Sequence, residues 1–474
     1  MNTPICDFVR RYAESDTLRL HMPGHKGVAS AFDITEVEGA DSLYEAGGII
    51  RESEENAGQL FGARTFYSTE GSSQCIRAML YLVCLYAKQA GKRPLIAAGR
   101  NAHKSFLSGA ALLDLDVMWL CPERPESYLS CKIDGPWLER MLENAQETPA
   151  AVYLTSPDYL GQVLDIRELA EVCHRRGILL LVDNAHGAYL KFLPGSRHPI
   201  DLGADMCCDS AHKTLPVLTG GAYLHVARPH VEASGRQRES APERREMWET
   251  WGHEGYEEQL ETAREAFAVQ AKRALALFGS TSPSYLILQS LDGANRYLAQ
   301  GYRERLSEFC GRLDRLKEKL RVGGYVLWAD EPLKITIAAK AYGYRGRELA
   351  DLLLEKNIVC EFSDPDFLVM MLTPETGEDG LLKLEKTLLS IPRKAEIAES
   401  APEFHLPEQV MSVRDAYFSV NETVKASESA GRVLAVATVG CPPAVPIVVG
   451  GERIDEAAVK CFSYYGIDEC TVVR

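Results

Sequence analysis

Two residues, each at or shortly after the end of an apolar segment, could together bind and activate a cofactor that carries an aldehyde group. Lys213 lies in SAHKT at 210–214, just after the apolar run MCC at 206–208. A lysine amine at the end of a strand can form a Schiff base with an aldehyde. Asp183 ends the apolar run at 179–182, and a carboxylate there could keep a pyridinium nitrogen protonated. The alternatives are an ordinary loop lysine and an aspartate that caps the next helix.

Two further segments could hold other parts of such a cofactor. The segment STEGSS at 68–73 is typical of a turn that opens a helix. Its backbone N–H groups and hydroxyls could bind a phosphate, although a serine N-cap would explain the same pattern. The segment RNAHKS at 100–105 follows a short apolar run and brings His103 to a strand end. An imidazole there could stack on a flat heteroaromatic ring, and the alternative is the start of a surface helix.

Other classes of site have little support in the sequence. No set of His, Cys, Asp or Glu residues has the spacing of metal ligands, so we expect no metal. Phosphate-binding P-loop, dinucleotide-binding and serine-hydrolase motifs are absent. The 13 cysteines include no C-x-x-C pair, which indicates reduced and mostly buried thiols.

Short apolar runs alternate with helical patterns through the first part of the chain. The runs lie at 95–98, 117–120, 151–154, 178–182 and 223–226. Buried strands that alternate with helices predict an α/β fold with a mainly parallel sheet, and the pattern becomes α+β from about residue 300. The expected parts are an N-terminal segment at 1–50, a large domain at 51–300, a small α+β domain at 301–392 and a C-terminal domain at 393–474.

The segment at 229–265 interrupts this alternation. It is highly charged and poor in aliphatic residues. Such composition predicts a solvated insertion, either a peripheral arm or a lid, that does not build the core.

The composition of the 474 residues limits the partners. The formal net charge is −15, which argues against nucleic acid and anionic membranes. No uncharged apolar stretch is long enough to span a membrane, and the first residues carry no apolar core of a signal peptide. We therefore expect a cytoplasmic protein of two to four domains.

The ordered motifs resemble those of the bacterial ornithine/lysine/arginine decarboxylases, enzymes that use pyridoxal 5′-phosphate (PLP) and have the aspartate-aminotransferase fold. The motifs are LHMPGHKG at 20–27, FDITEVEGADSL at 32–43, RNAHKS at 100–105, TSPDYLGQVLDI at 155–166, VDNAHG at 182–187, SAHKTLPVLTGG at 210–221, TSPSYLILQSLD at 281–292 and, more loosely, CPPAVPIVVGGE at 441–452. The resemblance implies a PLP-binding large domain, a small α+β domain and a C-terminal α+β domain, in a homodimer or higher homo-oligomer.

The resemblance also implies a role for individual residues. Lys213 would be the Schiff-base lysine, Asp183 the partner of the pyridinium nitrogen and His103 the residue stacked on the ring. The implied catalytic residues are Lys213, Asp183, His103 and His186. The implied cofactor-binding residues are Gly71, Ser72, Ser73, His103, Ser156, Asp183, Ala185, His186, Ser210, His212, Lys213, Thr281 and Ser282.

Thr281 and Ser282 would reach the phosphate of the partner subunit, and the active sites would be shared. The alternative is that they cap a helix that begins at Pro283. Three departures from the family pattern are Glu70, where the family usually has asparagine, Ala444, which replaces a glycine, and the stretch from His225 to Thr281, which is about twice the expected length and makes 229–265 resemble an insertion. No receiver-like domain precedes the motifs, so the chain resembles the short, biosynthetic type.

The expected activity is PLP-dependent decarboxylation of a basic amino acid. Arginine, lysine or ornithine would give CO2 and an amine of the polyamine pathway, with arginine favoured. One alternative is a PLP-dependent aminotransferase or another lyase. The other is a catalytically inactive homologue with a regulatory role.

Overall fold

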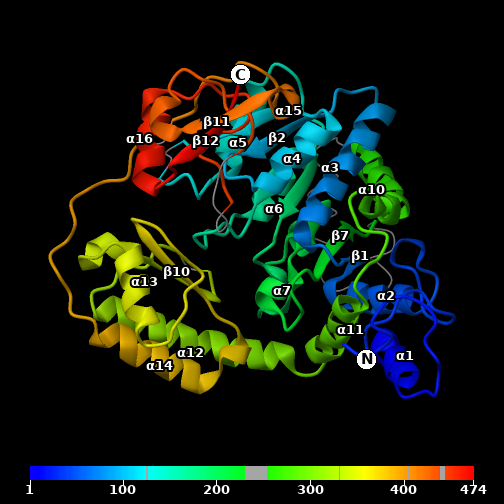
Figure 1. Ribbon diagram of the computed structural model, residues 1–474. Coiled ribbons are helices and arrows are strands. Elements are labelled where there is room, and N and C mark those ends of the chain that lie inside the picture. Colours follow the sequence, from blue (N-terminus) through cyan, green and yellow to red (C-terminus); the bar gives the residue numbers. More distant parts are fainter. Residues whose placement is uncertain (124–125, 230–253, 330, 404, 438–443) are drawn as a thin grey trace. The chain divides into compact units, whose positions relative to one another are not determined.

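The computed structural model describes residues 1–123, 126–229, 254–329, 331–403, 405–437 and 444–474 (Figure 1). Contacts within the chain divide it into two compact units. Met1–Ala97, Asp134–Leu154 and Asp165–Arg303 form the first unit, and Ala98–Ile133, Thr155–Leu164 and Glu304–Arg474 form the second.

The central sheet has seven strands in the order β1-β7-β6-β5-β4-β2-β3. Their bounds are β1 Ala63–Ser68, β2 Leu95–Gly99, β3 Asp116–Leu120, β4 Ala151–Thr155, β5 Leu179–Asp183, β6 Met206–Asp209 and β7 Ala222–Ala227. Strand β5 pairs in parallel with β6, whereas β7 pairs antiparallel with both β6 and β1. Every residue of β5 is buried, because a strand in a layered α/β fold is covered on both faces. The predicted α/β fold is confirmed.

The first unit surrounds its strands with helices. Their bounds are α1 Pro4–Ala13, α2 Ile49–Phe61, α3 Gly71–Gln89, α5 Gly135–Glu143, α6 Ile166–His174, α7 Ala211–Thr214, α10 Glu254–Ala276 and α11 Tyr285–Ala299, with short 3-10 turns η1 Leu43–Glu45, η2 Ala188–Phe192 and η3 Pro199–Leu202. Helix α3 forms because Ile76, Met79, Leu80 and Val83 recur at helical spacing, and all four are buried. Its first residue is Gly71, so the helix begins directly after the turn at 68–70.

Helix α10 contradicts part of the solvated insertion expected at 229–265. Residues 230–253 lie outside the described residues, but residues 254–265 form the first half of α10. Leu260, Ala263 and Phe267 are buried, and the helix packs on α3 and α6. The buried guanidinium of Arg264 also donates to Asp205 at 2.8 Å. A solvated arm is therefore wrong for residues 254–265, since their charges occupy one side of an amphipathic helix whose other side is in the core.

The second unit is α+β. Its helices are α4 Lys104–Leu113, α12 Tyr302–Val322, α13 Gly346–Leu354, α14 Gly377–Ser390, α15 Val413–Phe418 and α16 Glu456–Tyr465, with 3-10 turns η4 Ala339–Tyr342, η5 Pro374–Thr376 and η6 Ala426–Glu428. A three-stranded sheet has the order β8-β10-β9, and a two-stranded sheet pairs β11 with β12. These strands are β8 Lys334–Ala338, β9 Phe362–Ser363, β10 Phe367–Met371, β11 Asn421–Lys425 and β12 Glu469–Val473.

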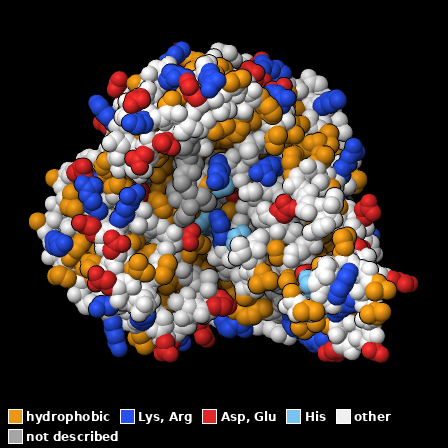
Figure 2. All heavy atoms as spheres, viewed as in Figure 1, with side chains coloured by type: hydrophobic (Ala, Val, Ile, Leu, Met, Phe, Trp, Pro, Cys, Tyr) orange, Lys and Arg blue, Asp and Glu red, His pale blue; other side chains and the backbone are white. Residues whose placement is uncertain are grey.

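The surface of the described residues carries charged side chains of both signs. Figure 2 shows them interspersed with apolar side chains over the visible face. Among the described helices, none combines the length and the apolar character that crossing a membrane requires.

Candidate active site

Asp183 lies at the carboxyl end of β5, in the first unit, with 3% of its surface exposed. The Tyr153 hydroxyl donates to its Oδ2 at 3.1 Å, and the backbone N–H of Ala185 donates to its Oδ1 at 3.2 Å. Burial raises the pKa of Asp183, while the charge of Lys213 and the two hydrogen bonds oppose that rise. The carboxylate is thus fixed in position by donors that favour its ionised form.

Lys213 and His186 meet beside this strand end. The Lys213 Nζ lies 2.9 Å from Nε2 of His186, which is 5% exposed. The contact follows from topology: β5 and β6 are parallel neighbours with Asp183 opposite Cys208, so their carboxyl ends meet at one edge of the sheet. His186 follows β5, and Lys213 lies in α7 directly after β6. The structure therefore brings the amine of Lys213 and the imidazole of His186 together beside the strand end that carries Asp183.

The N-terminus of α3 joins the lysine segment through two hydroxyls. The Ser210 hydroxyl donates to the Ser72 hydroxyl at 2.8 Å. Gly71 has a φ of +70°, and a side-chain carbon added there would meet nothing within 4 Å. Open space thus lies before a helix N-terminus that carries hydroxyl groups, which suits a phosphate. Ser73 is the next residue of the same helical turn.

His212 holds the loop that follows the lysine. Its Nδ1 donates to the Gly221 carbonyl at 3.0 Å, and its backbone N–H donates to the same oxygen at 3.2 Å. Burial lowers the pKa of His212, and the hydrogen bond to Gly221 opposes this effect. His212 therefore closes the segment between α7 and β7, next to Lys213.

His103 and Ser156 belong to the second unit. His103 is the N-cap of α4, and its Nδ1 accepts from the Ser105 backbone N–H at 3.1 Å. The Ser156 hydroxyl is buried and accepts from the Leu164 backbone N–H at 3.0 Å. Both side chains thus have local contacts within their unit, and their roles toward a cofactor stay predictions.

Thr281 and Ser282 are both exposed. The helix that follows, α11, begins at Tyr285 with Ser284 as its N-cap, so neither residue caps it and that alternative is wrong. The Ser282 backbone N–H donates to the Ser280 hydroxyl at 3.1 Å, and the Ser280 backbone N–H donates to the Glu70 carboxylate. The segment therefore lies beside the turn that opens α3.

Two buried residues support the site but carry no motif signal of their own. Tyr153 reaches Asp183 from the neighbouring strand β4. Asp209 accepts from Asn184 at 2.6 Å and from the imidazoles of His198 and His225, each at 3.1 Å. The two histidines hold the pKa of Asp209 well below its usual range despite burial, which alone would raise it. The hydrogen bond from Asn184 to Asp209 therefore links the residue after Asp183 to the residue before Ser210.

The same Asp209 network contains donor atoms of a kind that binds metals. His198, Cys207 and Asp209 each place one such atom within 4.8 Å of the others, and all three residues are buried. The hydrogen bond between His198 and Asp209 accounts for their proximity.

In the second unit a buried ion pair joins the motif at 100–105 to the C-terminal motif. Arg100 and Glu452, 3% and 1% exposed, lie 2.9 Å apart. Arg100 also donates to the carbonyls of Pro446 and Ile447, at 3.2 and 2.9 Å. Ala444, which stands where the family has glycine, has a φ of +57° in the left-handed region that favours glycine. The C-terminal motif is thus bound to the segment that carries His103.

Comparisons with known proteins find relatives over nearly the whole chain. The family model of the Orn/Lys/Arg decarboxylase major domain matches residues 3–323. The family model of the Orn/Lys/Arg decarboxylase C-terminal domain matches residues 396–469. The uncharacterized protein YaaO of Bacillus subtilis is 29% identical, over 98% of this chain and 94% of that protein. The arginine decarboxylase of the same organism is 26% identical, over 97% of this chain and 92% of that enzyme.

A solved structure shows the same fold. The lysine decarboxylase of Francisella novicida superposes with a TM-score of 0.72 at 18% identity, over 99% of this chain and 79% of that one. At that identity the likeness establishes the fold, whereas the family follows from the match of the major domain. The chain therefore belongs to the Orn/Lys/Arg decarboxylase family, which confirms the family, the fold and the class of amino-acid decarboxylase predicted from the motifs.

Proposed function

We propose that the protein decarboxylates a basic amino acid with PLP, and that arginine is the preferred substrate. The observation that carries the proposal is the contact of Lys213 with His186 beside the buried carboxylate of Asp183. The names of the arginine decarboxylases of Bacillus subtilis and Halalkalibacterium halodurans, at 26% and 27% identity, support the choice of arginine. The residues fit PLP in three respects: an amine, a buried carboxylate, and a helix N-terminus with free space before it.

When bound, PLP would supply a conjugated ring that accepts the electrons left at the α-carbon as CO2 departs. Asp183 would keep the ring nitrogen protonated, because its negative charge is buried and oriented by Tyr153 and Ala185. Gly71, with the nearby hydroxyls of Ser72 and Ser210, would bind the phosphate.

Lys213 and His186 would handle the proton that replaces the lost carboxylate. Their nitrogens are 2.9 Å apart, so one can supply a proton to the other during the cycle. His186 would keep the Lys213 amine oriented toward the substrate, and one of the two would protonate the α-carbon.

The working unit of the proposal is a homodimer or higher oligomer in the cytoplasm, and the amine serves polyamine synthesis. Thr281 and Ser282 would complete the phosphate site of the partner subunit, and Ser73, His212, Ser156 and His103 would contact the cofactor. An aminotransferase or another lyase would need a product other than CO2 and an amine. An inactive regulatory homologue would not be expected to retain both Lys213 and Asp183.

Borohydride reduction followed by peptide mapping tests the cofactor assignment. The protein saturated with PLP should carry the reduced cofactor on Lys213, and Lys213→Ala should carry none. The exposed Lys104 offers a matched control, since Lys104→Ala should label as the unchanged protein does. A label on another lysine, or none in the saturated protein, would remove the proposal.

A further inference from the structure

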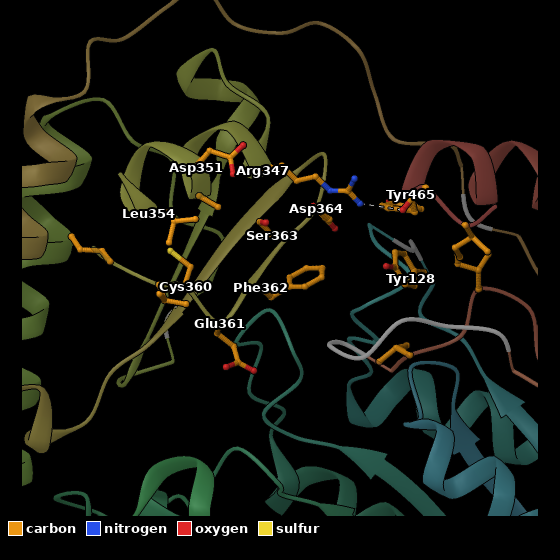
Figure 3. A pocket seen from close by; sticks show the side chains of 17 residues that line it. Tyr128, Arg347, Asp351, Leu354, Cys360, Glu361, Phe362, Ser363, Asp364 and Tyr465 are labelled. Atoms are coloured by element: carbon orange, nitrogen blue, oxygen red, sulfur yellow. Dashed lines mark hydrogen bonds between the residues drawn. The ribbon is translucent and has the colours of Figure 1, made fainter. Parts of the chain in front are cut away.

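A pocket of about 480 Å³ lies within the second unit (Figure 3). Helix α13, the segment around β9 and the residues at the end of α16 form its wall. Its main polar and aromatic side chains are Tyr128, Arg347, Asp351, Glu361, Asp364 and Tyr465. The volume falls within the range of small-molecule sites. None of these residues belongs to the cofactor site.

Asp364 carries the strongest signal of this pocket. It lies between β9 and β10 and is 4% exposed. Its Oδ1 accepts from the backbone N–H groups of Asp366 and Phe367, both at 2.7 Å. Its Oδ2 is buried and has no hydrogen-bond partner among the described residues. A buried carboxylate oxygen without a donor is costly, and because Asp364 lines the pocket, a donor group of a bound molecule would satisfy this atom.

The other charges of the pocket favour a cation. Three carboxylates, those of Asp351, Glu361 and Asp364, line it together with one guanidinium, that of Arg347. The sum of these formal charges is −2. Arg347 is also engaged with the Tyr465 backbone carbonyl, at 3.4 Å. A small molecule with one or two positive charges would therefore lower the electrostatic energy of the pocket.

Aromatic side chains supply the rest of the surface. The rings of Tyr128 and Tyr465 meet edge to face with their centroids 4.6 Å apart, and Phe362 lies on the wall formed by β9. Aromatic faces attract ammonium groups, and they pack well against methylene chains. Carboxylates beside aromatic rings suit an organic cation better than a hydrated metal ion.

We propose that this pocket binds an aliphatic amine, with an ammonium group donating a hydrogen bond to Oδ2 of Asp364. The class of ligand rests on the pocket alone. That the ligand belongs to the class of amines formed from basic amino acids rests on the proposed function. The site would then sense the amine at a place other than the cofactor site.

Calorimetric titration of the full chain with 1,4-butanediamine tests the proposal. The chain is first saturated with PLP and reduced with borohydride, so that no aldehyde remains to react with the amine. Saturable binding is expected, whereas the neutral 1,4-butanediol should not bind. Asp364→Asn should weaken diamine binding about tenfold or more, since it removes a charged acceptor. Asparagine still accepts both backbone hydrogen bonds, and the unfolding temperature without ligand checks the fold.

Asp379→Asn is the matched control, because this exposed carboxylate on α14 lies outside the pocket. It should bind the diamine as the unchanged protein does. If Asp364→Asn fails to fold, Asp351→Asn replaces it and should also weaken binding. The proposal would be overturned if the diamine showed no saturable binding, if Asp364→Asn bound it as tightly as the unchanged protein, or if Asp379→Asn lost as much affinity as Asp364→Asn. Binding of inorganic phosphate in place of the amine would also overturn it. The titration needs no turnover, so its failure is distinct from a failure of the decarboxylase assignment.

Discussion

The Asp183 carboxylate sits in a buried position where three partners, Tyr153, Ala185 and Lys213, act on its charge. Asp183→Asn keeps the shape but removes that charge, so the ring nitrogen would no longer be held protonated. We expect a loss of kcat of about a hundredfold or more. The measurement is steady-state turnover, with borohydride labelling of Lys213 to show that the variant still holds the cofactor. Near-native turnover would refute the assigned role.

The Tyr153 hydroxyl predicts a shift in the pH profile. Its hydrogen bond favours the ionised form of Asp183, so Tyr153→Phe should raise the pKa of Asp183 further above its ordinary value. Protonation of Asp183 would then begin at higher pH, and the acid limb of the kcat/KM profile should move upward. Tyr81→Phe, which removes a hydroxyl from α3 in the same unit, should leave the profile in place. An unmoved acid limb in Tyr153→Phe would count against the assigned contact.

At this scale the motifs predicted the side chains that meet at the candidate site, but not those that support them. Lys213, Asp183 and His186 each lie in a contiguous motif, so the sequence carries their signal directly. Tyr153 is 30 positions from Asp183 and meets it only because β4 and β5 are neighbours in the sheet. Asp209 likewise gathers its partners from separate strands and turns.

Among the elements, the C-terminal motif is fixed to the end of β2 by Arg100 and Glu452. Arg100→Met leaves a buried carboxylate without its partner, which typically costs about 3–5 kcal/mol. We expect a decrease of that size in the free energy of unfolding, measured by denaturant titration. Arg93→Met, which breaks the exposed pair with Glu147, should cost less than about 1 kcal/mol. The ion pair would have no special role if both variants were equally stable.

For one element, helix α10, the composition of the sequence predicted the wrong environment. The charges at 254–265 suggested a solvated arm, yet Leu260, Ala263 and Phe267 recur at helical spacing and are buried in α10. The average charge of a segment hides such a face, because apolar residues at positions i, i+3 and i+7 form one stripe along a helix while charged residues fill the other positions. The apolar runs of the sheet were less ambiguous, since most residues of a strand that is buried on both faces are apolar.

For the whole molecule, a dimer with shared sites makes a prediction about mixed subunits. Lys213→Ala and Thr281→Ala/Ser282→Ala proteins, each strongly impaired, are mixed under conditions of subunit exchange. If the sites are shared, a mixed dimer has one site with both defects and one with neither, so activity should return. Persistent inactivity after confirmed exchange would place Thr281 and Ser282 in the site of their own subunit.

The central claim is that Lys213 belongs to a site that decarboxylates basic amino acids. Its most direct test is CO2 release from carboxyl-labelled arginine, lysine and ornithine by the PLP-saturated protein, with the amine quantified in parallel. We expect CO2 and amine in equal amounts, fastest with arginine, and none from Lys213→Ala. A keto acid as product, no CO2 from any of the three substrates, or equal release by Lys213→Ala would contradict the claim.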